Sequence, residues 1–161
     1  MEWAVKELAG LQLPDQRLIK RAQLIVSQFS RQPTASIPQA CEELSQAKAA
    51  YRFFDNEEVA PEALIEAHTR STVQRMQGRE VVPALQDTTH LNYSTHPETE
   101  GLGPISNNAD KTIGLMLHAT LAVSPEEEAL GLLSARTWVR DSRLFGSNRK
   151  AHRRSPKPTK R

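Results

Sequence analysis

The residues that best fit a chemical role are Gln86-Asp87-Thr88-Thr89, where a carboxylate comes at the end of a short apolar segment. Enzymes that transfer phosphoryl groups with metal ions place their first metal ligand at the end of a sheet strand in this way. Mg²⁺ needs several hard oxygen ligands, and the acids that follow Asp87 all fall in expected loops or turns. We therefore expect Asp87 to be a catalytic residue and metal ligand in an incomplete site. Such a site would hold no Mg²⁺ stably and catalyse nothing alone.

Three strand patterns accompany this carboxylate. The first runs from Glu80 to Asp87, and its proline indicates an edge strand or a bend. The second, Thr112 to Val123, alternates apolar with small or polar residues, which predicts a half-buried strand. A third follows from Ala129 to Arg140, and the short turn before it predicts an antiparallel hairpin. The long stretch from Ser94 to Lys111 is expected to be a loop.

The N-terminal part is predicted to be helical. Leu18, Ala22, Ile25 and Phe29 form one apolar stripe at helical spacing, and Asp15 precedes it as a start signal. A short second helix is expected from Ser36 with a capping box, and another from Ser45. These two short helices resemble a helix-turn-helix, whose second helix would enter the major groove of DNA. A last helix is expected from Pro61 to about Gln77.

Two groups of side chains share helix faces in this region. One group is Arg17, Lys20 and Arg21; the other is Lys48, Tyr51 and Arg52. On the second face a lysine can neutralise a phosphate, and an arginine can pair with guanine through two hydrogen bonds. Surface helices carry such residues routinely, and the aromatic residues after position 50 also fit a core. DNA binding and a plain helical surface both remain open at this point.

Composition and charge limit the class of protein. The single cysteine allows no internal disulfide, no apolar run is long enough to span a bilayer, and the first residues lack a signal-peptide pattern. We therefore expect a cytoplasmic protein with no membrane partner. Residues 140–161 hold nine Lys or Arg against one acid, although the whole chain carries only +2. This tail is expected to be disordered, either as a phosphate-binding arm or as a linker.

Several short blocks, taken in order, resemble bacterial cut-and-paste transposases of the insertion-sequence-four family, in its Tn-five-like branch. The blocks are Glu2-Trp3, Asp15-Gln16-Arg17-Leu18 with Arg21, Ser36-Ile37-Pro38-Gln39-Ala40-Cys41, Ala49-Ala50-Tyr51-Arg52-Phe53-Phe54-Asp55-Asn56, Gln86-Asp87-Thr88-Thr89, Gly101-Leu102-Gly103-Pro104-Ile105, and Gly114-Leu115 with His118. The resemblance covers the chain to about Arg140. It implies an α+β protein in which a helical domain that binds transposon ends precedes an RNase H-like domain.

The resemblance also implies roles for individual residues. Asp87 matches the first acid of the family's Asp-Asp-Glu triad, which uses two divalent metals, usually Mg²⁺. Arg52, Arg17 and Arg21 match positions implied to lie close to DNA. His118 matches a histidine on the second strand, and packing within the sheet is its expected role. The resemblance further implies a bacterial, nucleoid-associated location.

The expected organisation follows from these matches. Residues 1–78 would form the DNA-binding domain, 79–140 the first three antiparallel strands of a truncated RNase H-like domain, and 141–161 the basic tail. The expected partner is the double-stranded DNA of transposon terminal inverted repeats, with an intact transposase or a missing C-terminal part as a protein partner. The alternatives are one part of a split or frameshifted transposase, an inactive remnant, or a helical interaction domain that never touches DNA.

Overall fold

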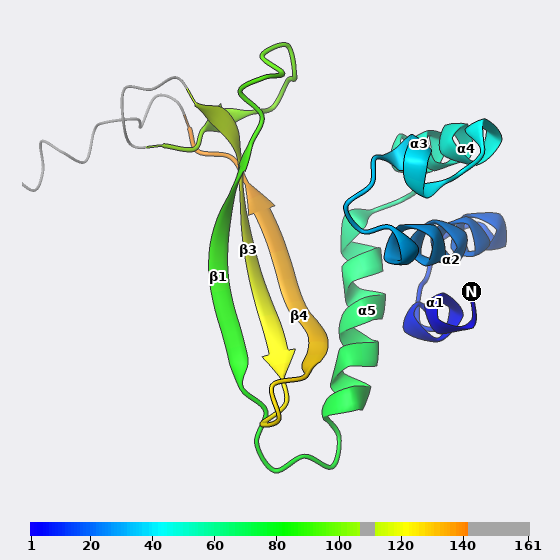
Figure 1. Ribbon diagram of the computed structural model, residues 1–161, viewed down its shortest axis with the longest axis vertical. Helices are drawn as coiled ribbons and strands as arrows, with labels where there is room; N and C mark the ends of the chain where they lie inside the picture. Colours follow the sequence, from blue (N-terminus) through cyan, green and yellow to red (C-terminus); the bar gives the residue numbers. More distant parts are fainter. Residues whose placement is uncertain (107–111, 142–161) are drawn as a thin grey trace, which may run out of the picture. The chain divides into compact units, whose positions relative to one another are not determined.

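The computed structural model describes residues 1–106 and 112–141. Five helices come first in the described chain: α1 (Glu2–Glu7), α2 (Gln16–Arg31), α3 (Ile37–Ala40), α4 (Leu44–Phe54) and α5 (Pro61–Met76). Four strands follow: β1 (Ala84–Asn92), β2 (Gly103–Pro104), β3 (Ile113–Val123) and β4 (Ala129–Trp138) (Figure 1). The expected α+β class is confirmed. The basic tail lies outside the described residues apart from its first positions.

Two compact units can be distinguished by their internal contacts. The first comprises Met1–Leu85 with Leu121–Ser134, and the second comprises Gln86–Thr120 with Ala135–Arg161. All five helices belong to the first unit, together with the turn that joins β3 to β4. The three-part division expected from the sequence stays a prediction. No helix in the described ranges is long and apolar enough to cross a membrane.

The expected helices form where their start signals lie. The Asp15 carboxylate accepts a hydrogen bond from the backbone N–H of Arg17, which caps α2 as predicted. The Gln39 side chain accepts hydrogen bonds from Ser36 at the start of α3, and Pro61 is the first residue of α5. One predicted boundary is wrong: α4 begins at Leu44, before the expected Ser45. The N-cap of α4 is Glu43, whose backbone is extended although its side chain makes no capping hydrogen bond, so this start carries no sequence signal.

A small apolar core holds the helices together. Its buried residues come from α2, α4 and α5 and from the segments that follow α1 and α3: Leu8, Leu11, Ala22, Ile25, Cys41, Ala47, Ala50, Phe53 and Ala67. Contacts join α1 to α2 and α5, and α2 to α3 and α4. More than half of the core side chains are alanine or cysteine, so the helices approach closely. The apolar stripe of α2 predicted from the sequence faces this core.

The sheet differs from the expectation at β1. The sequence predicts a first strand that ends at Asp87, but β1 runs from Ala84 to Asn92 and Asp87 lies near its middle. Pro83 has no N–H for a sheet ladder, so the strand begins after it, and the β-branched Thr88 and Thr89 favour its continuation. Hydrogen bonds to β3 at both ends set the register: Val123 N–H donates to the Pro83 carbonyl, and Tyr93 N–H donates to the Ile113 carbonyl.

The remaining strands pair with β3. The β3–β4 hairpin confirms the predicted pair of strands, with a turn closed by the Ser124 N–H and the Glu128 carbonyl at 2.8 Å. The short strand β2 pairs antiparallel with β3, with Gly103 opposite Gly114. The sequence assigns β2 to a loop, so the described chain has four strands where three are expected. Two residues are too few to show a strand pattern in sequence, and only the pairing reveals β2.

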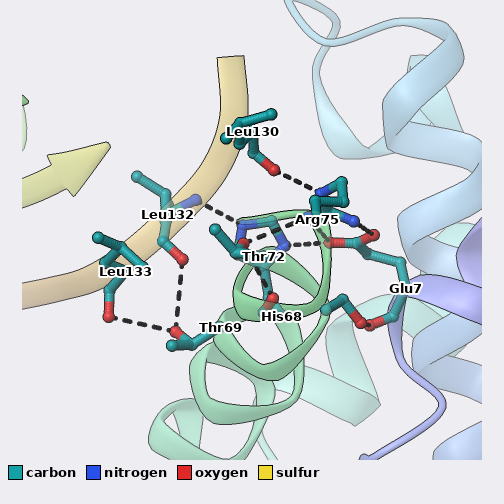
Figure 2. Close-up of polar contacts among 9 residues, drawn as sticks. Glu7, His68, Thr69, Thr72, Arg75, Leu130, Leu132 and Leu133 are labelled. Atoms are coloured by element: carbon teal, nitrogen blue, oxygen red, sulfur yellow. Dashed lines mark hydrogen bonds and ion pairs between the residues drawn. The ribbon is translucent and has the colours of Figure 1, made fainter. Parts of the chain in front are cut away.

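Side chains of α5 cover the backbone edge of β4 (Figure 2). Arg75 Nε donates to the Leu130 carbonyl at 2.5 Å, and Thr69 Oγ1 donates to the Leu132 and Leu133 carbonyls at 3.4 and 3.3 Å. His68 Nε2 accepts the Leu132 N–H at 2.9 Å. An edge strand exposes unpaired N–H and carbonyl groups, and these helix side chains satisfy them. The helix therefore closes one edge of the hairpin without adding a strand.

Glycine is required where β4 meets the helix. Gly131 has φ +137°, a conformation that L side chains rarely adopt. A Cβ atom at this position would collide with the Thr72 hydroxyl and would lie 2.8 Å from Arg75 Nη2. The absence of a side chain allows the α5 side chains to reach the strand backbone.

A buried carboxylate anchors the same α5 side chains to α1. Glu7 is 5% exposed and accepts hydrogen bonds from Arg75 at 2.8 and 3.0 Å, while His68 Nδ1 lies 2.5 Å from its Oε1 atom (Figure 2). His68 Nε2 accepts a backbone N–H, so the ring proton resides on Nδ1 and points to Glu7. Burial raises the pKa of the Glu7 carboxyl, but the hydrogen bonds and charge of Arg75, aided by His68, outweigh burial and hold that pKa below its ordinary value.

Candidate nucleic-acid interface

Helix α4 presents a cationic and aromatic face to solvent. Ala47, Ala50 and Phe53 are buried on its inner side. On the outer side Lys48, Tyr51 and Arg52 are all exposed, Tyr51 to 51%. Their i, i+3 and i+4 spacing places them on one surface of the helix. The structure thus brings together the three side chains that the sequence assigns to one face.

The segment before α4 gives the helix pair its shape. Residues 41–43 join α3 to α4, and Glu42 has φ +63° while Glu43 N–H donates to the Cys41 carbonyl at 2.6 Å. Both helices contact α2. A short helix, a tight turn and a longer second helix packed on a third helix make up the arrangement found in helix-turn-helix domains. In such domains the second helix enters the major groove, and this role of α4 stays a prediction.

The cationic residues of α2 differ in their surroundings. Arg17 pairs with Asp15, with Nη2 at 2.7 Å from the carboxylate, and this pairing lowers the pKa of Asp15 and raises the pKa of Arg17. Lys20 is exposed, and in the described part of the chain no ion pair or hydrogen bond of its side chain is found. A phosphate would therefore meet Lys20 directly, whereas it would compete with Asp15 for Arg17.

Arg21 links two helices. Its Nη1 atom donates to Gln46 Oε1 of α4 at 2.6 Å, and the contact is partly buried. Gln46 lies on the flank of α4 that faces α2, away from Lys48 and Arg52. The sequence groups Arg21 with Arg17 and Lys20 as a DNA contact, and that role stays a prediction. What the structure shows is a guanidinium that fixes the position of α4 against α2.

The predicted metal ligand belongs to the second compact unit. Asp87 is exposed on β1, and the register of β1 with β3 places it opposite Ala119. Neighbouring Thr88 points to the other face of the sheet, where its hydroxyl lies 2.8 Å from His118 Nδ1. His118 is half-buried and faces away from Asp87, and its packing role stays a prediction.

No cluster of metal-binding side chains surrounds Asp87 in the described part of the chain. No cluster of three or more His, Cys, Asp or Glu side chains that could hold a metal ion occurs within residues 1–106 and 112–141. Mg²⁺ requires near-octahedral oxygen coordination and rarely binds to one carboxylate. Within these ranges Asp87 therefore belongs to no such cluster. Metal ligation by Asp87 stays a prediction.

Comparison with known proteins supports a DNA-binding domain at the N-terminus. Residues 1–59 match a protein family described as transposase DNA-binding. The matched region contains α1 to α4, and with them the exposed face of Lys48, Tyr51 and Arg52. The N-terminal region is therefore similar to the DNA-binding domains of transposases, which supports DNA as a partner of this region.

Sequence reasoning misses the surroundings of two residues on α4, one on each side of the helix. The start signal at Ser45 places Leu44 before the helix, yet Leu44 is the first residue of α4 and is 71% exposed. Gln46 carries no signal of its own, because its contact is with Arg21, which lies 25 residues earlier. Helical spacing finds residues that share one helix, but it does not find pairs that form between helices.

Proposed function

We propose that this chain recognises the terminal inverted repeats of a transposon by placing α4 in the major groove of double-stranded DNA. The observation that carries the proposal is the outer face of α4, which exposes Lys48, Tyr51 and Arg52 within the region matched to transposase DNA-binding domains. Lysine and arginine supply charge for phosphates, and arginine can also donate two hydrogen bonds to guanine. Helix α2 supports α4 through Arg21 and Gln46.

The resemblance to Tn-five-like transposases also supports a wider assignment. We infer that the strands belong to an RNase H-like domain, with Asp87 as the first acid of its triad. The antiparallel order of β1, β3 and β4, with the acid on β1, supports this inference. The described residues contain no group of three or more metal-binding side chains, so no cleavage step is assigned to them.

Fluorescence anisotropy with the full chain tests DNA recognition. The inverted repeats that flank the gene are compared with a scrambled duplex of equal length over a salt series. Preferential binding to the repeats that persists at moderate salt is expected. Equal binding to both duplexes that disappears with salt would contradict the proposal, because counterion release alone accounts for that behaviour.

Asp87→Ala provides the matched control for this assay. An exposed strand carboxylate outside the α4 face should leave repeat binding unchanged, whereas Arg52→Ala should weaken it by about 1–3 kcal/mol if Arg52 contacts a base. A large loss of binding by Asp87→Ala would assign this residue a structural role and count against metal ligation.

A further inference from the structure

Leu44 is an exposed apolar side chain on the face of α4 that carries the cationic residues. It is 71% exposed, more than any other large apolar side chain in the described residues. A lone exposed leucine is ordinary on a protein surface. Leu44, however, lies four residues before Lys48 and seven before Tyr51, so the three side chains lie along one side of α4.

The charges around Leu44 indicate which part of DNA it meets. Glu42 and Glu43 directly precede it and are exposed, and Glu43 accepts a hydrogen bond from Ser45 Oγ at 3.3 Å. Two carboxylates disfavour close approach to phosphates. Lys48, one turn further along the helix, favours it. The start of α4 therefore suits the floor of the groove, and Lys48 suits the phosphate backbone.

We propose that Leu44 contacts the C5-methyl group of a thymine and selects thymine at one position of the recognised site. Residues at the start of a recognition helix meet base edges, and the thymine methyl is the apolar group that the major groove displays. The inference rests on the proposed function, since it requires α4 to lie in the groove. It makes Leu44 a specificity-determining residue, whereas Lys48 supplies affinity through a phosphate.

The test removes a single methyl group from the DNA. A duplex is first selected from a randomised pool by the full chain, and each thymine in it is then replaced by deoxyuridine, which keeps the pairing edge and loses the methyl. One such replacement should weaken binding about fourfold, as expected for one methyl group removed from contact. Leu44→Ala should weaken binding to the thymine duplex at least as much. The Leu44→Ala variant should bind the thymine and deoxyuridine duplexes with equal affinity.

Control variants separate this contact from general effects. Leu44→Met keeps an apolar side chain and should retain the response to deoxyuridine. Val73→Ala removes apolar surface from a 46% exposed residue on α5 and should behave like the unaltered chain. Because Leu44 is exposed, its substitution should leave the melting temperature unchanged, which thermal unfolding will verify.

The outcomes distinguish this inference from the proposal beneath it. If no sequence is selected from the pool, recognition by α4 and the role of Leu44 both fail. If a sequence is selected and Lys48→Ala weakens its binding, but no thymine replacement acts through Leu44, only the present inference is overturned. A leucine that contacts a protein partner instead of DNA would give this second result.

Discussion

The Glu7 carboxylate accepts two hydrogen bonds from the Arg75 guanidinium, 2.8 and 3.0 Å long, across 68 residues of sequence. The same guanidinium donates to the Leu130 carbonyl of β4. A single arginine thus joins the first helix of the chain to the backbone of its last described strand. Because Glu7 is almost completely buried, its charge must be compensated within the protein.

Glu7→Gln should lower the free energy of unfolding by about 2 kcal/mol, because Arg75 and His68 would lose a charged acceptor in a buried setting. Urea denaturation measures this change. Glu2→Gln on the same helix is the matched control: Glu2 pairs with Lys6 at 2.8 Å, but both side chains are largely exposed. That control should cost less than about 1 kcal/mol. Equal losses of unfolding free energy for Glu7→Gln and Glu2→Gln would mean that the buried contacts of Glu7 stabilise the fold no more than an exposed ion pair does.

The stabilisation from Glu7 should depend on pH in a defined direction. The folded-state pKa of Glu7 lies below its ordinary value of 4.5, so the folded protein binds this proton less readily than the unfolded chain does. The contribution is complete above pH 4.5 and is lost as the pH falls through the folded-state pKa. The difference in unfolding free energy between the unaltered chain and Glu7→Gln should therefore shrink on acidification. A difference that grows instead would reverse the assigned sign.

Gly131→Ala should destabilise the protein by about 2 kcal/mol or more, since a Cβ atom meets both an unfavourable φ and the Thr72 hydroxyl. Gly78→Ala separates the two causes. Gly78 has φ +77°, and a Cβ atom there would meet nothing within 4 Å, so only the backbone cost of about 1 kcal/mol applies. Thermal or urea unfolding of both variants gives the comparison. A smaller loss at Gly131 than at Gly78 would contradict the close approach of α5 and β4.

Arg21 and Gln46 should be energetically coupled. Arg21→Ala and Gln46→Ala each remove the same 2.6 Å hydrogen bond. The double variant should therefore lose about 1 kcal/mol less free energy of unfolding than the sum of the two single losses. Lys20→Ala, one residue away and exposed, should change stability by less than about 0.5 kcal/mol. Additive effects of Arg21→Ala and Gln46→Ala would remove the support that this pair gives to α4.

Lys48 and Arg52 should affect DNA binding in different ways. Lys48→Ala should weaken binding to all sequences alike and reduce the slope of log affinity against log salt by about 1, because one phosphate contact is lost. Arg52→Ala should relax the preference at one base pair if its guanidinium reads guanine. Anisotropy titrations of both variants on the selected duplex and on a scrambled one measure the two effects. Identical behaviour of the two variants would assign both residues to the backbone.

The sequence by itself determined most of the helical part. The apolar stripe of α2, the Asp15 cap, the Ser36–Gln39 pair and Pro61 are local signals, and the helices form where these signals lie. The exposed face of Lys48, Tyr51 and Arg52 also follows from spacing, because residues three and four apart share a helix surface in any fold.

The tertiary structure decided what depends on distant residues. The sequence predicts that Asp87 ends a strand, but pairing with β3 extends β1 past it to Asn92, since cross-strand hydrogen bonds set strand ends that composition does not. Arg21 meets Gln46, and Glu7 meets Arg75, only through packing of helices far apart in sequence. Local periodicity contains no information about which elements meet, so these contacts become visible only in the folded chain.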